Sequence, residues 1–206
     1  MGTGQGQIGS SWGQYGNQSE VDPWLAKFIR AQSTSLASQE EGYSLFFDLA
    51  QKQLDEVKKC NREVQELRGA QSQDQATVIL QKQSDSLQRY TGTILATARI
   101  FWDQKMYKQT AKVLQQCRDI CGDEIAWQLN LAHTLFVQEN YALAKEMYKK
   151  IIERQQLNSI LDVTPVVLAN LCVCHVMLEE NEVGEEIIVR VDKEEERQLM
   201  QNPDQQ

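Results

Sequence analysis

Residues 126–140 read AWQLNLAHTLFVQEN, and this stretch decides the fold because it repeats an earlier part of the chain at a fixed offset. Ala98 corresponds to Ala132, and Phe101 corresponds to Leu135. The same offset also relates Tyr107 to Tyr141, Thr110 to Ala144, Leu114 to Tyr148 and Cys117 to Ile151. Each pair joins side chains of similar size, so the sequence predicts that one structural unit occurs twice in succession.

The offset, about 34 residues, is the length of a tetratricopeptide unit, in which two antiparallel helices are joined by a short turn. Small side chains at Ala98, Thr110, Ala132 and Ala144 let the helices approach, while the larger members of each pair fill the space between them. Tyr107 and Tyr141 open the second helix of each unit.

A third, weaker unit follows if about six residues are inserted around residues 157–164. Leu171, Cys172, Gly184, Ile188 and Val191 then fall at the corresponding positions. Gly184 replaces the usual alanine, which costs roughly 1 kcal/mol of helix stability. We therefore expect two to three repeats over residues 90–192, forming part of a right-handed superhelix with a groove.

Upstream of the repeats, residues 40–89 are predicted to form a long antiparallel helical hairpin. Apolar side chains recur every three or four residues from 40 to 68, and Leu80, Leu87, Ile94 and Phe101 then lie seven apart. Seven-residue spacing is also typical of a coiled coil between chains, so an oligomerisation module is the alternative interpretation. The fold class is all-α in both cases.

The two ends of the chain differ from its middle. Residues 1–39 hold six of the eleven glycines and few charges, which predicts a disordered tail. Within it, residues 22–30 have the pattern of a short amphipathic helix, with Asp22 as N-cap and Pro23 as first residue. That helix folds back on its own domain or docks on a partner. Residues 193–206 form a charged C-terminal end.

Composition and motifs disfavour several classes of function. The formal net charge of −8 is the wrong sign for binding nucleic acid, and no apolar stretch is long enough to predict insertion into a membrane. No phosphate loop or hydrolase motif predicts a small-molecule substrate or a cofactor, and the N-terminus lacks the pattern of a secretory signal. We expect the cysteines to be reduced.

Neither thiol catalysis nor a zinc site is favoured by the spacing of the cysteines and histidines. Cys117 and Cys172 occupy packing positions of the repeats, where a free cysteine acts as a small hydrophobic residue. A zinc site built on Cys117 and Cys121, or on Cys172 and Cys174 with His175, would need a second ligand pair at a matching spacing, and the sequence has none. The prediction is therefore a protein that is not an enzyme and has no catalytic or metal-ligating residues.

A groove lined by the first helix of each repeat is the predicted binding surface, because amide and imidazole side chains there can hydrogen-bond the backbone of a bound peptide. The residues predicted to face this groove are Gln128, Asn130, His133, Asn170 and His175.

Residues 126–140, together with VLANLCV at 167–173, ARIFW at 98–102 and KEEE at 193–196, closely resemble the tetratricopeptide-repeat subunit of the ciliary intraflagellar transport complex B, the tetratricopeptide repeat protein 30 family. The resemblance covers residues 40–206 and the middle to C-terminal portion of longer proteins, whereas residues 1–39 match nothing in that family.

This resemblance implies a superhelical scaffold without catalytic residues. It would wrap an extended, proline-rich segment of another complex B core subunit and travel with kinesin-driven trains. The location would be the cilium, at the axoneme and ciliary base, and the cytoplasm. The resemblance also implies support of anterograde transport, cilium assembly and tubulin polyglutamylation.

Overall fold

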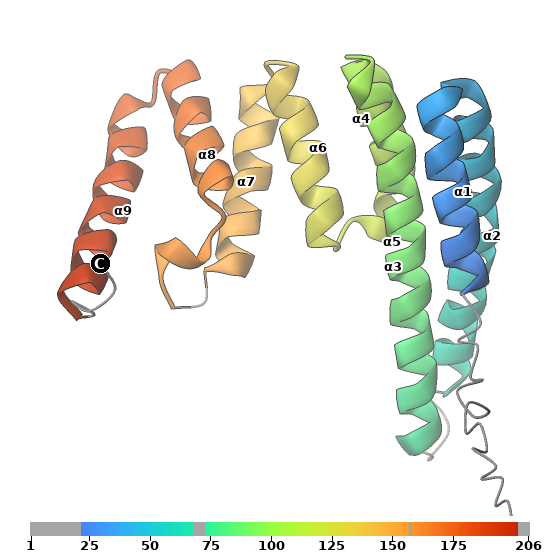
Figure 1. Ribbon diagram of the computed structural model, residues 1–206. Helices are drawn as coiled ribbons and strands as arrows, with labels where there is room; N and C mark the ends of the chain where they lie inside the picture. The colour runs from blue at the N-terminus through green and yellow to red at the C-terminus, as the bar shows by residue number, and fades with distance from the viewer. Residues whose placement is uncertain (1–21, 68–72, 157, 202–206) are drawn as a thin grey trace, which may run out of the picture.

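The computed structural model describes residues 22–67, 73–156 and 158–201, and this part of the chain contains helices and no strands. The predicted all-α class is confirmed. In chain order the elements are α1 (Pro23–Ala37), α2 (Gln39–Leu67), α3 (Gln73–Asp103), α4 (Tyr107–Gln116), α5 (Arg118–Cys121), α6 (Ile125–Val137), α7 (Tyr141–Gln155), the 3₁₀ helix η1 (Ile160–Asp162), α8 (Pro165–Met177) and α9 (Asn181–Gln201). They stand in one row from α1 and α2 to α9 (Figure 1).

The backbone repeats with the period that the sequence predicts. Lys105 and Glu139, which are one repeat period apart, both have a φ of 60°, and Glu179, at the corresponding place further along the chain, has a φ of 62°. Each lies in the turn between the two helices of a unit. In each turn the next residue's N–H donates to a carbonyl five residues back; Met106 donates to Phe101, Asn140 to Leu135 and Glu180 to His175, all at 2.9 Å. These are Schellman caps, and they define three repeats.

The first repeat consists of the C-terminal part of α3 together with α4. The second repeat consists of α6 and α7, and the third of α8 and α9. The interval from Glu139 to Glu179 is longer than that from Lys105 to Glu139, and the extra length is the predicted insertion. It contains η1, which a capping box closes: the Ser159 hydroxyl accepts from the Leu161 N–H at 3.2 Å, and the Asp162 carboxylate accepts from the Ser159 N–H at 2.8 Å.

Packing inside the repeats follows the predicted size pattern. Ala132, Ala144, Leu114, Tyr148 and Ile151 are fully buried. Ala98, Thr110, Cys117 and Leu135 are also buried, whereas Phe101, Tyr107 and Tyr141 are half-buried. The turns carry a repeated aromatic pair, with ring centroids 5.1 Å apart for Trp102 and Tyr107 and 5.7 Å apart for Phe136 and Tyr141. Edge-to-face pairs of this kind fix the angle between the two helices.

Residues 23–37 form α1, which contains the short helix predicted for residues 22–30 and continues through residues that were predicted to be disordered, and residues 1–21 lie outside the described residues. Asp22 caps the helix by accepting from the Trp24 N–H at 2.9 Å, as predicted. Trp24 Nε1 donates to Thr93 Oγ1 of α3 at 3.3 Å, and the Phe28 ring lies 5.4 Å from that of Phe46 in α2. The helix therefore folds back on its own chain, and tertiary contacts extend it past residue 30.

The close approach of α1 and α2 depends on Gly42. A Cβ atom at this position would lie 2.4 Å from the Cα of Ser35, which is far inside van der Waals contact. Only glycine lets the two helix backbones meet here. Ser38 is the one residue between the helices; its N–H donates to Thr34 O at 2.7 Å.

Helices α2 and α3 pair within the chain as an antiparallel hairpin that extends beyond the repeat helices (Figure 1). Phe46, Val57 and Cys60 of α2 are buried, and Leu87 and Ile94 of α3 are half-buried. This pairing takes up much of the apolar face that a coiled coil between chains would use, while Leu80 remains 52% exposed.

Two predicted boundaries fall inside helices. Helix α3 runs without a break through residues 89 and 90, so the hairpin and the first repeat share one helix. Helix α9 continues to Gln201 through most of the charged segment that was predicted to begin at residue 193. In the described part of the chain, no helix combines the length and the apolar character needed to cross a membrane.

Candidate protein-binding face

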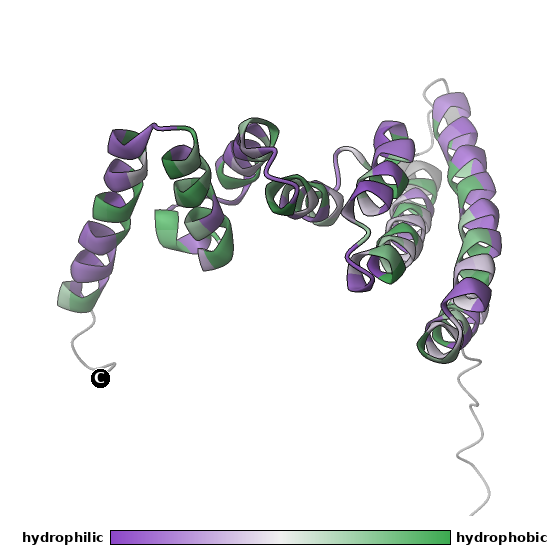
Figure 2. Cartoon of the chain, turned by 90° about the horizontal axis from the view of Figure 1, so that it is seen from above, coloured by the Kyte–Doolittle hydropathy of each residue, from purple (hydrophilic) through white to green (hydrophobic). Residues whose placement is uncertain are grey.

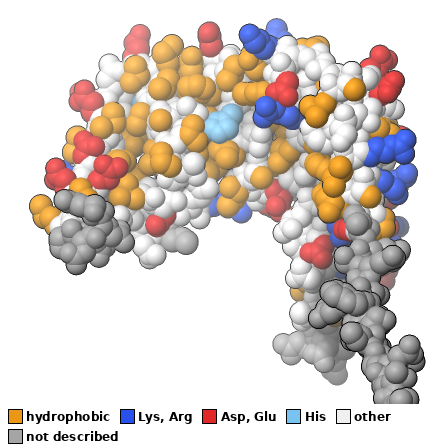
Figure 3. All heavy atoms as spheres, viewed as in Figure 1, with side chains coloured by type: hydrophobic (Ala, Val, Ile, Leu, Met, Phe, Trp, Pro, Cys, Tyr) orange, Lys and Arg blue, Asp and Glu red, His pale blue; other side chains and the backbone are white. Residues whose placement is uncertain are grey.

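Helix α8 carries apolar side chains both toward the core and toward solvent. Val166, Val173, Val176 and Met177 are 49%, 42%, 55% and 53% exposed. Their spacing of seven, three and one residues places them along one side of the helix, which in most amphipathic helices is polar. Figure 2 shows apolar residues around much of α8, and Figure 3 shows hydrophobic side chains gathered over α6 to α9. An exposed apolar strip of this kind marks a binding surface.

A cavity of about 390 Å³ lies between the first and second repeats. Ala98, Arg99 and Trp102 of α3 line one wall, and Asn130 and His133 of α6 line the other. Two of the predicted groove residues therefore border a real depression. Trp102 adds an aromatic wall that the sequence analysis did not assign to the groove.

His133 and Asn170 are brought together by a buried hydroxyl. The Tyr148 OH of α7 lies 2.6 Å from His133 Nδ1, and Asn170 Nδ2 of α8 lies 3.1 Å from the same hydroxyl and 3.2 Å from His133 Nδ1. Burial lowers the pKa of His133 and raises the pKa of Tyr148 to about 12. Both groups are therefore neutral at pH 7, so the hydroxyl donates to Nδ1 and accepts from the amide. The network ties α6, α7 and α8 together.

Gln128 has a local structural role. Its Nε2 donates to the Gly122 carbonyl at 2.7 Å, and its Oε1 accepts from Arg154 at 3.3 Å. Both ends of the amide thus hold the turn between α5 and α6 against α7.

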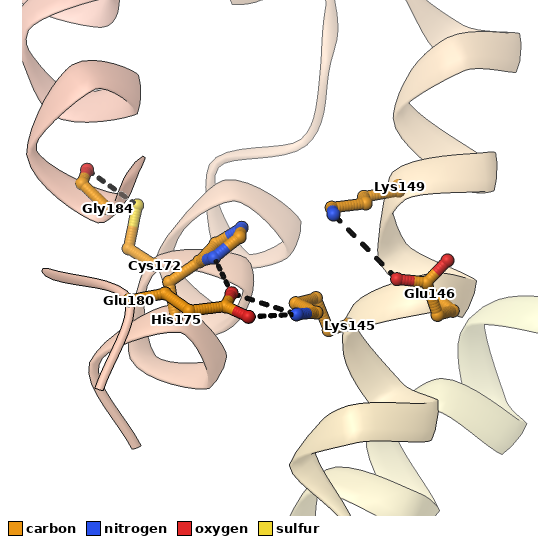
Figure 4. A network of polar contacts seen from close by, with 7 residues as sticks. All are labelled: Lys145, Glu146, Lys149, Cys172, His175, Glu180 and Gly184. Carbon is orange, nitrogen blue, oxygen red and sulfur yellow. Dashed lines mark hydrogen bonds and ion pairs between the residues drawn. The ribbon is translucent and has the colours of Figure 1, made fainter. Parts of the chain in front are cut away.

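His175 does not face a groove, and this prediction is wrong. Its side chain is 1% exposed, because its place in the third repeat corresponds to that of Leu135, a core residue of the second. His175 Nδ1 lies 2.6 Å from Glu180 Oε2, and the same carboxylate accepts from Lys145 Nζ of α7 at 2.7 and 2.8 Å (Figure 4). The hydrogen bonds from Lys145 and His175 lower the pKa of Glu180.

Neither the Lys145–Glu180 contact nor the exposed strip of α8 was predicted from the sequence. The strip could have been predicted, because apolar residues occupy most positions of α8, whereas a half-exposed helix usually has polar residues along its exposed side. No sequence pattern predicts the ion pair, because Lys145 and Glu180 are far apart in the sequence and belong to different repeats.

The five cysteines are free thiols, and the structure gives them packing roles. The hydrogen bond with Cys121 and burial raise the pKa of Cys117, and burial alone raises that of Cys174 to about 11. Contacts with Cys117 and Thr91 lower the pKa of Cys121, which is 0% exposed and out of reach of a substrate. Within residues 22–67, 73–156 and 158–201, no cluster of His, Cys, Asp and Glu side chains has the arrangement to hold a metal ion.

The repeated Schellman turns, the small residues between paired helices and the exposed apolar face together define a helical-repeat protein of the tetratricopeptide class.

The family model for the C-terminal domain of intraflagellar transport protein 70 matches residues 17–206, and the chain belongs to this family. It is 32% identical over 185 residues to intraflagellar transport protein 70A of Danio rerio and of Xenopus tropicalis, and 33% identical to intraflagellar transport protein 70B of Bos taurus. Each match covers 89% of this chain and 28% of the relative. The match from residue 17 includes α1, which the sequence analysis had left outside the resemblance.

Proposed function

We propose that this chain is a protein–protein interaction scaffold of the intraflagellar transport machinery, without catalytic activity of its own. The exposed apolar strip of α8 carries the proposal, because exposed apolar patches mark surfaces that bind other proteins. Membership of the intraflagellar transport protein 70 family supports the setting in which the strip acts.

An extended, proline-rich segment of another complex B core subunit is the partner that fits this face best. Such a segment has no internal hydrogen bonds and lies along a surface, with its rings in apolar or aromatic depressions. The cavity beside Trp102 supplies such a depression, and the strip supplies exposed apolar surface. Asn130 is exposed at the rim and its Nδ2 donates to the Ala126 carbonyl at 2.8 Å, so its Oδ1 is the atom that would accept from a peptide backbone.

This binding would make the chain part of kinesin-driven trains in the cilium, between ciliary base and axoneme, with a pool in the cytoplasm. The scaffold would support anterograde transport and cilium assembly, and through them tubulin polyglutamylation. The family resemblance supports these roles. The chain covers only 28% of the length of its relatives, so the first question to test is whether it is sufficient for assembly with other subunits.

The test is affinity purification of the tagged chain from ciliated cells with quantitative mass spectrometry. The variant Val173→Glu/Val176→Glu places two carboxylates on the strip. The matched control is Leu143→Glu on α7, because Leu143 is 55% exposed, like Val176. We expect complex B subunits with the parent chain and the control, and at least about tenfold lower recovery with the strip variant.

Equal recovery with the strip variant would contradict the proposal. Light scattering of the purified chain then addresses the alternative function. A stable dimer that recovers no complex B subunit would favour an oligomerisation module, whereas a monomer is expected here because α2 and α3 already pair within one chain.

A further inference from the structure

Each of the first two repeats buries its outer side under the repeat that follows. In the first repeat Leu114 and Cys117 are buried, and Trp127 of α6 donates to the Leu114 carbonyl at 2.9 Å. In the second repeat the equivalent residues Tyr148 and Ile151 are 0% exposed, and Asn170 of α8 donates to the Tyr148 hydroxyl. A helix from the next unit therefore covers the same positions twice in succession.

In the third repeat, no helix among the described residues covers the same positions. Ile188 corresponds to Tyr148 and is 51% exposed, and Val191, which corresponds to Ile151, is half-buried. Together with Leu168 and Cys172 of α8, they line an open apolar groove of about 350 Å³. This edge is apolar and retains the shape that receives a helix in the two earlier repeats.

The rim of the groove is acidic. Asp192 and Glu195 line it and are exposed. The second repeat has Ile152 and Gln155 at the corresponding positions, so repeat packing does not require these carboxylates. The basic residues of this part of α9, Arg190, Lys193 and Arg197, line a separate depression beside Glu194. The groove thus selects positive charge at its border.

We infer that the outer edge of α8 and α9 is a docking site for an amphipathic α-helix of another protein. The apolar side chains of this helix, three and four residues apart, enter the groove at Ile188 and Val191, and lysine or arginine residues beside them face Asp192 and Glu195. The repeat register sets the helical shape of the occupant, and the acidic rim sets its charge. The site is separate from the apolar strip of α8 and does not depend on the proposed function.

The experiment uses the full chain and two fluorescent helical peptides of about 20 residues, long enough to span α8. Both carry leucine at helical spacing; one has lysines flanking the leucines, and the other has glutamates in their place. Fluorescence anisotropy should show binding of the lysine peptide that weakens as salt rises. Ile188→Ser should weaken it by about tenfold or more. Leu143→Ser, at a residue of similar exposure on α7 that belongs to neither face, is the control and should not change it.

A second variant tests the rim without touching the apolar floor. Asp192→Lys/Glu195→Lys should lower the affinity for the lysine peptide and raise that for the glutamate peptide. Equal affinities for the two peptides, no binding up to about 1 mM, or a lysine peptide that binds Ile188→Ser as well as the parent would each overturn the inference. Self-association that Ile188→Ser abolishes would also overturn it, by assigning the edge to a second copy. The Val173→Glu/Val176→Glu purification tests the other face, so either proposal can fail alone.

Discussion

At both junctions between repeats the second helix of one unit contacts the first helix of the next, α4 with α6 and α7 with α8, but different groups hold the two junctions. At the first junction the donors are an indole and an amide, and the acceptors are backbone carbonyls. Trp127 Nε1 donates to Leu114 O at 2.9 Å, and Gln138 Nε2 donates to Tyr107 O at 2.7 Å. None of these groups titrates near neutral pH.

At the second junction side chains bind side chains. Asn170, Tyr148 and His133 form one network, and Lys145, Glu180 and His175 form the other (Figure 4). The first junction thus depends on the burial of apolar side chains, and the second depends in addition on polar side chains that can gain or lose a proton. Burial sets the strength of the first junction, and the second adds dependence on pH and on the exact side chain.

The largest expected effect is at the first junction. Trp127 is 3% exposed, and Trp127→Ala leaves a cavity and removes a buried hydrogen bond. We expect a loss of about 3–5 kcal/mol in the free energy of unfolding, measured by urea denaturation followed by circular dichroism. Trp127→Phe retains much of the apolar volume and should lose clearly less. Equal losses for the two variants would mean that the N–H, and not the packing, holds this junction.

At the second junction, removing a single oxygen should have a measurable effect. Tyr148→Phe keeps the ring and leaves Asn170 Nδ2 and His133 Nδ1 without their shared partner. The expected loss is about 1–3 kcal/mol, from the same denaturation measurement. A double-mutant cycle with Asn170→Ala should show coupling between the two sites. Additive effects would show that the amide and the hydroxyl act independently.

The fold was largely predictable from the sequence because repeat packing is local. Ala132 and Ala144 must be small and Leu114 and Tyr148 large, whatever lies elsewhere in the chain, so the repeat period is readable in one sequence. The helix α1 was harder to predict, because its stability comes from Thr93 and Phe46, which are far away in sequence.

The candidate site was less predictable, because the residue types at a repeat position do not reveal how far each side chain reaches. His133 and Asn170 were rightly placed on first helices, but the hydroxyl that joins them belongs to α7. His175 was placed in the groove although the position equivalent to Leu135 is a core position. That prediction relied on the polar character of His175, whereas its position in the repeat correctly indicated a core residue.

A smaller and opposite effect is expected inside the third repeat. Gly184 lies within α9, and a Cβ atom there would meet the Cys172 carbonyl oxygen at 3.6 Å and the His175 Cβ at 3.7 Å, which are ordinary contacts. Gly184→Ala should therefore stabilise the protein by about 1 kcal/mol through helix propensity. Gly42→Ala is the control with the opposite sign, since its Cβ would lie 2.4 Å from the Ser35 Cα. Destabilisation by Gly184→Ala would show that the third repeat is packed more tightly than the distances indicate.

The smallest expected effect is a pH dependence that only the second junction shows. Burial lowers the pKa of His133 below its ordinary value of 6.5. As the pH falls through 6.5, the unfolded chain binds a proton that the folded chain does not, so stability falls until the pH reaches the folded pKa. His133→Gln removes this titration, while the other ionisable groups remain common to both proteins. The difference in unfolding free energy between the parent and the variant should therefore shift against the parent between about pH 7.5 and 5.5. A constant difference would mean that His133 titrates alike in both states, and Trp127→Phe, which removes no titrating group, should give that constant difference.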